Sequence, residues 1–163
     1  METFNQLLQR LIDAQIEFVV IGGFAGVLHG SAHVTQDLDI CAVLTETNIQ
    51  RLREVLKDLH PRHRMTSQKL SFLEVPAKGD PPVRNLYLVT DWGIIDILTD
   101  VIGVGDYERL KSKAVSIPLG NKTCLLMSLD DLIKTKETLG REKDLLVVKE
   151  LRAIAATRPP AQK

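Results

Sequence analysis

The chain has 163 residues, which is enough for one compact domain with a substantial core. Hydrophobic residues make up 44% and charged residues 26%, close to the globular average, so neither a disordered chain nor a membrane protein is indicated. The 21 basic and 21 acidic residues give a formal net charge of zero, which excludes a global basic field for nucleic acid and leaves only local patches.

The N-terminal segment is predicted to contain a helix, a strand and a short helix. Thr3 with Gln6 makes a capping-box pair, and apolar side chains then recur at helical spacing. Residues 18–21 are β-forming side chains that end at two glycines, as a buried strand would. Residues 24–30 follow as a short helix that stops at a glycine.

The middle of the chain alternates between strand and helix signals. Residues 37–44 read as a strand whose alternation puts Asp37 and Asp39 on the face opposite its apolar side chains. Thr47 with Gln50 is predicted to cap the helix that follows.

Three further strands are predicted at residues 70–75, 85–90 and 93–99. The last two pair as a hairpin across residues 90–92. Residues 76–82 form a loop, because their prolines cannot donate to a β-ladder.

The predicted elements of the last third of the chain are mostly helices. We expect a short helix over residues 106–113, a hairpin turning at Gly120-Asn121, a helix capped by Ser128 and interrupted at Gly140, and a last helix over residues 141–156. No internal repeat is visible. We therefore predict a single domain over residues 1–157 and a disordered tail over residues 158–163.

Targeting signals are missing from the sequence. Cys41 and Cys124 are too few and too widely separated for a disulfide scaffold or a zinc site. The N-terminus lacks the basic start and apolar run of a signal peptide, and no apolar run reaches the ~18 to 20 residues that span a bilayer. We expect a cytoplasmic protein with no membrane partner.

The strand-borne carboxylates are the first candidate site. Asp37 and Asp39 project from the same face of one strand, about 6 to 7 Å apart. Two adjacent negative charges are unfavourable unless a cation or protons neutralise them, and Mg²⁺ with oxygen ligands does so. The pattern alone is also common in turns and solvated strand ends.

A third carboxylate, Asp96, lies mid-strand between isoleucines and leucine. Burying an unpaired charge there would be costly, so a partner is required. One interpretation is a salt bridge to a nearby Arg or Lys. The other is that its strand lies beside the strand of Asp37 and Asp39, so that the three carboxylates form a magnesium cluster.

Gly22 and Gly23 fall between a strand and a helix, where glycine allows phosphate to approach backbone amides. They match neither a P-loop nor a dinucleotide-binding fingerprint. Taken alone, they are equally well explained as a tight turn. A second local candidate for polyanion contact is the basic segment at residues 61–69, which can also be read as a solvated loop.

The ordered combination resembles the polymerase-β-type nucleotidyltransferase superfamily. It comprises a strand, Gly-Gly, a short helix, His-Gly, Thr-x-Asp-x-Asp and a third Asp about 60 residues later. More narrowly it resembles minimal nucleotidyltransferases that include AbiEii-type toxins, because LMSLDDLIKTKETLGREKDLLVVKEL is similar to that group's leucine-rich segment. The resemblance covers residues 15–152.

The resemblance implies an α/β (α+β) fold, with a mixed β-sheet flanked by helices and a helical C-terminal segment. It also implies Mg²⁺-dependent transfer of a nucleotidyl group from an NTP to an acceptor hydroxyl. Catalytic and metal-binding roles then fall to Asp37, Asp39 and Asp96, and Asp96 would help to deprotonate the acceptor. Gly22 and Gly23 would face the phosphates, and Thr35 would shape the loop before the first aspartate.

The C-terminal charged cluster comprises Lys136, Arg141, Lys143 and Asp144 around the break at Gly140. On composition alone it is a solvated helix start with acids near its N-terminus. The resemblance instead implies nucleotide binding, with Lys136 or Lys143 contacting the triphosphate and Asp144 positioning one of them or the acceptor.

Two positions depart from the family pattern. Gly23 stands where many members carry Ser, which removes a hydroxyl from the phosphate site. His33 stands where the AbiEii-like group often has Arg, and a neutral imidazole anchors an anion less well than a guanidinium.

Three functions are therefore carried forward. The first is a toxin–antitoxin-type enzyme that modifies RNA, tRNA in particular, with an antitoxin protein as partner. The second is an aminoglycoside-like enzyme that modifies a small hydroxylated molecule. The third is a catalytically silent nucleotidyltransferase-like binding module.

Overall fold

The computed structural model describes residues 2–159. The elements in chain order are α1 (Glu2–Asp13), β1 (Phe18–Ile21), α2 (Gly22–Leu28), β2 (Asp37–Ala42), α3 (Glu46–Leu56), the 3₁₀ turn η1 (Lys57–Leu59), β3 (Arg62–His63), β4 (Leu86–Thr90), β5 (Gly93–Leu98), β6 (Asp100–Val101), β7 (Gly105–Asp106), α4 (Tyr107–Lys113), β8 (Val115–Leu119), β9 (Lys122–Leu126), α5 (Leu129–Leu139) and α6 (Glu142–Thr157).

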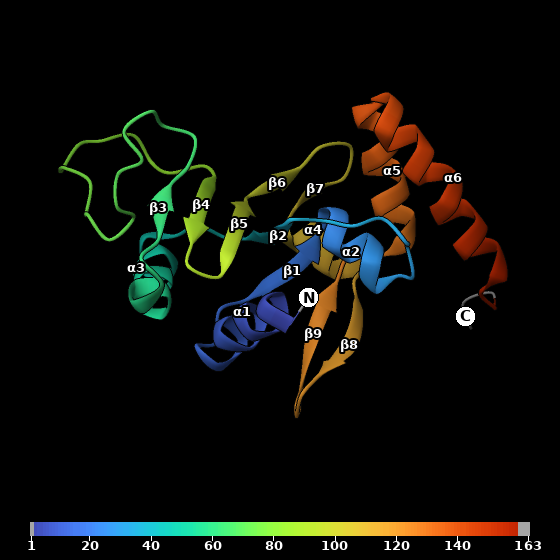
Figure 1. Cartoon of the computed structure of the whole chain (residues 1–163), viewed down its shortest axis with the longest axis horizontal. Helices are drawn as coiled ribbons and strands as arrows, with labels where there is room; N and C mark the ends of the chain where they lie inside the picture. The colour runs from blue at the N-terminus through green and yellow to red at the C-terminus, as the bar shows by residue number, and fades with distance from the viewer. Residues whose placement is uncertain (1, 160–163) are drawn as a thin grey trace.

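A seven-stranded sheet in the order β3-β4-β5-β2-β1-β9-β8 forms the centre of the molecule. It is mixed, because β2 pairs with β5 and β1 with β9 in parallel while the other neighbours are antiparallel. Helices flank it, and α5 and α6 lie side by side at one end (Figure 1). β6 and β7 form a separate two-stranded hairpin. The predicted mixed α/β architecture with a helical C-terminal segment is confirmed.

The core explains why β1 and α1 form where they do. All four residues of β1 are buried, as expected of a strand in the middle of a covered sheet. The predicted apolar stripe of α1 packs inward, with Phe4 edge-on to Phe24 of α2 at a ring-centroid distance of 5.2 Å. Each such buried side chain contributes roughly 1.5 to 3 kcal/mol of transfer free energy.

Two predicted helix caps are wrong by one or two positions. α1 starts at Glu2, so Thr3 lies inside the helix and does not cap it. α3 is capped by Thr45, whose side chain accepts a hydrogen bond from the Asn48 amide, and Thr47 is inside the helix. Thr45 has the extended backbone that a cap requires, and this follows from the preceding strand rather than from residue type.

The predicted strand at residues 70–75 is also wrong. Leu70, Leu73 and Val75 are exposed, and the segment makes only one isolated bridge, from Ser71 to Arg62. The pairing edge of β4 is already taken by β3, which the sequence did not predict. The segment is held instead by buried Phe72, whose carbonyl accepts a hydrogen bond from Arg53 at 3.0 Å.

The other predicted turns are confirmed. β4 and β5 pair up to Thr90 and Gly93, and β8 and β9 turn at Gly120. Ser128 caps α5 by accepting from the Asp131 amide, and Gly140 ends that helix in the left-handed conformation. The β6–β7 hairpin was not predicted.

The ends of the chain and its cysteines complete the description. Of the predicted tail at residues 158–163, residues 160–163 lie outside the described part, while Arg158 donates to the carbonyl of His29 at 3.0 Å. Cys41 and Cys124 are free and buried. Between residues 2 and 159, no helix is long and apolar enough to cross a membrane.

Candidate functional site

Strand pairing brings the three predicted carboxylates together. β2 and β5 run parallel with Asp39 in register with Asp96, and Asp37 in register with Ile94. Neighbouring strands lie about 4.8 Å apart, so Asp96 is a direct neighbour of Asp39. Asp37, two residues from Asp39 on the same strand, projects from the same face. The strand of Asp96 therefore lies where the sequence predicted it.

The surroundings of Asp39 disfavour its charged form. Burial raises its pKa to about 7, the charges of Asp96 and Asp37 add to the rise, and Lys136 and Arg64 oppose it. Near neutral pH, Asp39 is therefore divided between its protonated and ionised forms. A bound cation would relieve the same repulsion.

Asp96 has a protein partner as well. It is buried, with 6% of its surface exposed, and Arg64 engages both of its carboxylate oxygens. The Arg64 Nε donates to Oδ1 at 3.0 Å, and a second guanidinium nitrogen donates to Oδ2. The salt-bridge interpretation of Asp96 is confirmed. Asp96 also lies beside Asp39, as the second interpretation requires, while the magnesium cluster itself stays a prediction.

The donor set fits a hard divalent cation, because three carboxylates in mutual repulsion supply the oxygen ligands that Mg²⁺ prefers. Within residues 2–159, however, no three acidic, His or Cys side chains converge closely enough to hold a metal ion. Both oxygens of Asp96 accept hydrogen bonds from Arg64 instead. The magnesium ion therefore stays a proposal.

The electrostatics of Asp39 predict a pH-dependent stability. Its pKa is raised from 3.8 to about 7 on folding, so the folded state keeps a proton that the unfolded state releases between those values. Stability of the metal-free protein should therefore fall as pH rises from about 4 to about 7 and stay lower above it. Asp39→Asn should remove this loss and stabilise the metal-free protein by about 2 kcal/mol at pH 8, after allowance for solvent screening.

Urea unfolding of both proteins at pH 5 and pH 8 in chelator measures this difference. The gain from Asp39→Asn should be present at pH 8 and smaller at pH 5. Equal gains at the two values would contradict the expected protonation.

The two glycines lie directly against the aspartate strand. α2 follows β1 without a loop, and Gly22 has φ of +68°. A side chain at Gly22 would overlap the Asp39 carboxylate, and one at Gly23 would lie 3.0 Å from the Thr35 hydroxyl oxygen. That hydroxyl donates to the carbonyl of Asp37 at 3.0 Å. Close approach to Asp39 and Thr35 thus requires glycine here, whatever the phosphate does.

Gly22→Ala should destabilise the protein by about 2 kcal/mol, because a left-handed non-glycine residue costs roughly 1 to 2 kcal/mol and the new methyl displaces the Asp39 carboxylate. Gly79→Ala is the matched control, since Gly79 also has positive φ but nothing lies within 4 Å of an added Cβ. Thermal unfolding of both variants measures the difference. Equal losses would show that the contact with Asp39 contributes nothing.

The C-terminal charged cluster lies beside the carboxylates. Asp144 of α6 is 1% exposed and accepts from Arg141 at 2.6 and 3.2 Å and from Lys136 at 3.4 Å. The Arg141 hydrogen bond and the nearby Lys136 hold the pKa of Asp144 below its usual range. Asp144 therefore fixes two cations from opposite sides of the helix break at Gly140.

A cavity of about 270 Å³ joins the two halves of the site. Six of the predicted site residues line one part of this cavity. Its apolar wall comes from β4, β5, the β6–β7 hairpin and α5. The lining includes Gly22, Gly23, Asp39, Asp96, Lys136 and Arg141, with Tyr87, Leu98, Val101, Ile102 and Leu139 as the wall.

Four predicted site residues lie outside this lining. Thr35 supports Gly23 and Asp37 from behind, and Asp144 is buried beneath the two cations it holds. Asp37 lies at the start of β2, and Lys143 is exposed on α6. Of the two lysines proposed to contact a triphosphate, only Lys136 faces the cavity.

Sequence reasoning missed the partner of Asp96. Arg64 lies in the basic segment considered for polyanion contact, yet its guanidinium is directed to Asp96 and lies 5.6 Å from the ring centroid of Tyr87. The need of a buried Asp96 for a cation was a usable signal, but it did not point to one arginine among many.

The loop between α2 and β2 is tied to α6. Glu150 accepts from the Ser31 hydroxyl at 2.8 Å and from the Ala32 amide at 2.6 Å, and it contacts the His33 ring nitrogen at 2.6 Å. His33, at the position where the AbiEii-like group often has Arg, thus has a protein partner. His29 is buried with its ring nitrogen 2.7 Å from the Met127 carbonyl, and burial lowers its pKa.

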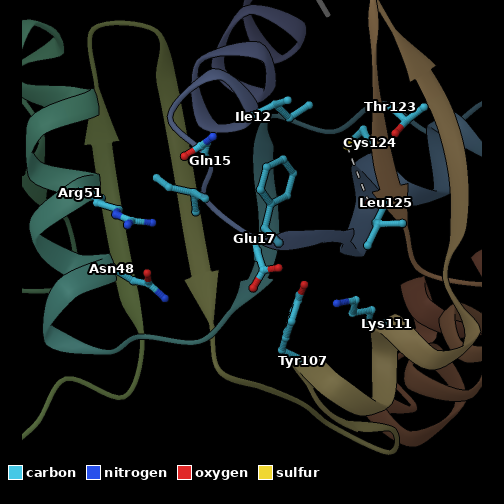
Figure 2. A pocket seen from close by; sticks show the side chains of 12 residues that line it. Ile12, Gln15, Glu17, Asn48, Arg51, Tyr107, Lys111, Thr123, Cys124 and Leu125 are labelled. Carbon is cyan, nitrogen blue, oxygen red and sulfur yellow. Dashed lines mark hydrogen bonds between the residues drawn. The ribbon is translucent and has the colours of Figure 1, made fainter.

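A second cavity, of about 500 Å³, lies at the opposite end of β1 (Figure 2). It is lined around Phe18, where β1 begins, whereas the aspartates lie near Ile21, where β1 ends. Glu17, Arg51 and Lys111 supply its charged side chains, and none of the predicted site residues lines it. The candidate active site is therefore the smaller cavity.

Solved structures share the fold of this chain. The lincosamide antibiotic adenylyltransferase LnuA, solved with lincomycin bound, matches with a TM-score of 0.61 at 15% identity, over 94% of this chain and 96% of that one. The antibiotic-resistance factor ANT(2'')-Ia matches with a TM-score of 0.53 at 10% identity, over 95% and 92% of the two chains.

An antigenic nucleotidyltransferase-like protein from Paracoccidioides brasiliensis matches with a TM-score of 0.54 at 14% identity, over 96% of this chain and 75% of that one. No family model and no curated protein matches the chain. At these identities the likeness establishes the nucleotidyltransferase fold, and the narrower AbiEii-like resemblance stays a prediction.

Proposed function

We propose that this chain, which has the nucleotidyltransferase fold, transfers a nucleotidyl group from an NTP to an acceptor hydroxyl with Mg²⁺ as cofactor. The observation that carries the proposal is the register of Asp39 with Asp96, which brings these two carboxylates to one cavity with Lys136, while Asp37 lies two residues from Asp39 on the same strand. A purely structural site has no need of three carboxylates in mutual repulsion.

The reaction forms a bond from the acceptor oxygen to the α-phosphorus and breaks the bond from that phosphorus to the bridging oxygen, which leaves with pyrophosphate. Asp96 receives the proton of the acceptor hydroxyl. Asp37 and Asp39 would hold the metal and Asp96 would share it, and the bound metal would supply positive charge to the phosphate oxygens. Lys136 and Arg141, fixed by Asp144, bind the remaining phosphate charge.

The glycines serve the same site in this proposal. Gly22 and Gly23 line the cavity without side chains, so phosphate oxygens can approach the backbone there. Thr35 supports this surface through its contact with Gly23 and its hydrogen bond to Asp37.

Two acceptor classes follow from different features. The apolar wall of Tyr87, Leu98 and Ile102 favours a small hydroxylated molecule with an apolar face, as does the likeness to antibiotic-modifying enzymes. Exposed Arg141 and Lys143 on the other side favour RNA, tRNA in particular, in a toxin–antitoxin system whose antitoxin would be a protein partner.

The test is a transfer assay with Mg²⁺, each of the four labelled NTPs, and either total RNA or a panel of hydroxylated small molecules as acceptor. Labelled RNA would support the RNA acceptor and a labelled small molecule the alternative. A calorimetric titration of NTP with and without Mg²⁺ tests the silent-module reading, which predicts no metal-dependent binding. No transfer to any acceptor with any NTP would refute the enzyme.

A further inference from the structure

Arg64 occupies the position at which the carboxylate cluster needs a positive charge. It follows directly after β3 and reaches Asp96 on the neighbouring part of the sheet. Its side chain is 26% exposed and that of Asp96 is 9% exposed, so the pair is shielded from solvent. The charges of Asp96, Asp37 and Asp39 all raise the Arg64 pKa, after the hydrogen bond to Asp96 as the largest cause.

The same contact conflicts with the proposed metal. Arg64 donates to both oxygens of Asp96, and those are the only atoms with which Asp96 could bind a cation. A guanidinium and a divalent cation also repel each other at short range. Each oxygen of Asp96 keeps a second lone pair, but a divalent cation bound there would lie beside the Arg64 charge, so the two cations compete for Asp96; this conclusion rests on the proposed function.

We propose that Arg64 is the resident counter-charge of the carboxylate cluster and competes with the divalent cation for Asp96. In the metal-free protein Arg64 positions Asp96 and keeps a buried carboxylate paired. When the cation binds, Arg64 releases Asp96, whose oxygens then become available to the cation and to the acceptor proton. Arg64 is thus a positioning residue whose loss strengthens metal binding.

The neighbouring aromatic ring gives the released side chain a place to remain. The Arg64 guanidinium lies 5.6 Å from the ring centroid of Tyr87, within the range of a cation–π contact. Tyr87 also pairs in register with Asp96 across β4 and β5. Arg64 can therefore leave the carboxylate while it keeps a favourable contact beside it.

The experiment is a calorimetric titration of Mg²⁺, and of Mn²⁺ as a second probe, into the wild-type protein, Arg64→Met and Arg62→Met. Arg64→Met should bind the metal about tenfold more tightly, as expected when a close competing charge is removed. Arg62→Met is the matched control, because Arg62 is exposed in β3, two residues before Arg64. The metal affinity of this variant should stay within about twofold of wild type.

A thermal readout accompanies the titration. Without metal, Arg64→Met should unfold at a lower temperature than wild type, since Asp96 loses its partner, and Mg²⁺ should raise its midpoint more than that of wild type. Arg64→Lys, which keeps the charge but loses the two-pronged contact, should show a smaller gain in affinity and serves if the Met variant fails to fold.

Equal or weaker metal binding by Arg64→Met and Arg64→Lys, with clear binding by wild type, would overturn the competition and leave the proposed function intact. Absence of metal binding in all the proteins would overturn the metal site itself, and the competition with it.

Discussion

Replacing Asp39 by Asn is expected to lower nucleotidyl transfer by about 1,000-fold. Asp39 lies between the other two carboxylates, two residues from Asp37 on β2 and in register with Asp96 on β5. Its substitution replaces one carboxylate oxygen by an amide nitrogen and removes the negative charge proposed to hold the metal, while the side chain keeps nearly the same shape. Initial rates of label transfer from NTP, at saturating Mg²⁺, measure the loss.

Asp91→Asn is the control for this loss. Asp91 is exposed in the turn between β4 and β5, where it contacts His60 at 2.6 Å, and it does not line the cavity of the candidate site. The Asp91→Asn variant should transfer label at the wild-type rate. A rate within tenfold of wild type for Asp39→Asn would mean that the three carboxylates are not the catalytic site.

Asp144→Asn is expected to destabilise the protein by about 3 kcal/mol, the largest loss of stability foreseen for a single substitution here. Asp144 is 1% exposed and neutralises both Arg141 and Lys136, so its removal leaves Lys136 in a half-buried position without its partner. Urea unfolding at pH 7 measures the loss. Transfer should fall as well, because both cations line the cavity.

The pH dependence of the free energy of unfolding distinguishes loss of the Asp144 charge from loss of its packing. Folding lowers the pKa of Asp144, so its stabilising contribution is present above the pKa of the unfolded carboxyl, about 4, and disappears as pH falls through the lower folded value. The difference between wild type and Asp144→Asn should therefore narrow at low pH. Lys143→Met is the control, because Lys143 is exposed on the same turn of α6 and its loss should change stability by less than about 0.5 kcal/mol.

The carboxylate cluster was accessible from the sequence because each of its members carries a local signal. Asp37 and Asp39 alternate on one strand, and Asp96 is an isolated charge in a run of isoleucines and leucine that must be buried. What alternation cannot give is the neighbour of a strand, since β2 and β5 are separated by a helix, β3, β4 and a long loop. The pairing was therefore one of two interpretations of the buried Asp96, and a salt bridge was the other.

The errors concern details that local patterns do not fix. Residues 70–75 have strand-forming side chains, but they contact the outer edge of β3 through a single bridge and bury only Phe72. Thr45 and Thr47 are both suitable capping residues, and the structure uses Thr45. Neither outcome can be decided from a window of a few residues.

The glycines show a different limit. Their place between strand and helix indicated contact with phosphate, whereas the structure shows that Gly22 must be small because Asp39 lies against it, and Gly23 because Thr35 does. Glycine thus meets both the expected approach of phosphate and the close packing against Asp39 and Thr35, and the sequence alone could not distinguish these two reasons. The wall formed by Val101 and Ile102 was missed because the β6–β7 hairpin is too short to leave a periodic pattern.

The anchoring of the α2–β2 loop by Glu150 has a consequence for synthesis of the chain. The aspartates leave the ribosome early, but Lys136, Arg141 and Asp144 and the residue that holds the loop before Asp37 all follow much later, on α5 and α6. A nascent chain that has exposed the whole sheet therefore still lacks both the cationic side of the cavity and the anchor of the loop before Asp37. On the proposed function, nucleotidyl transfer should begin only once α6 has emerged.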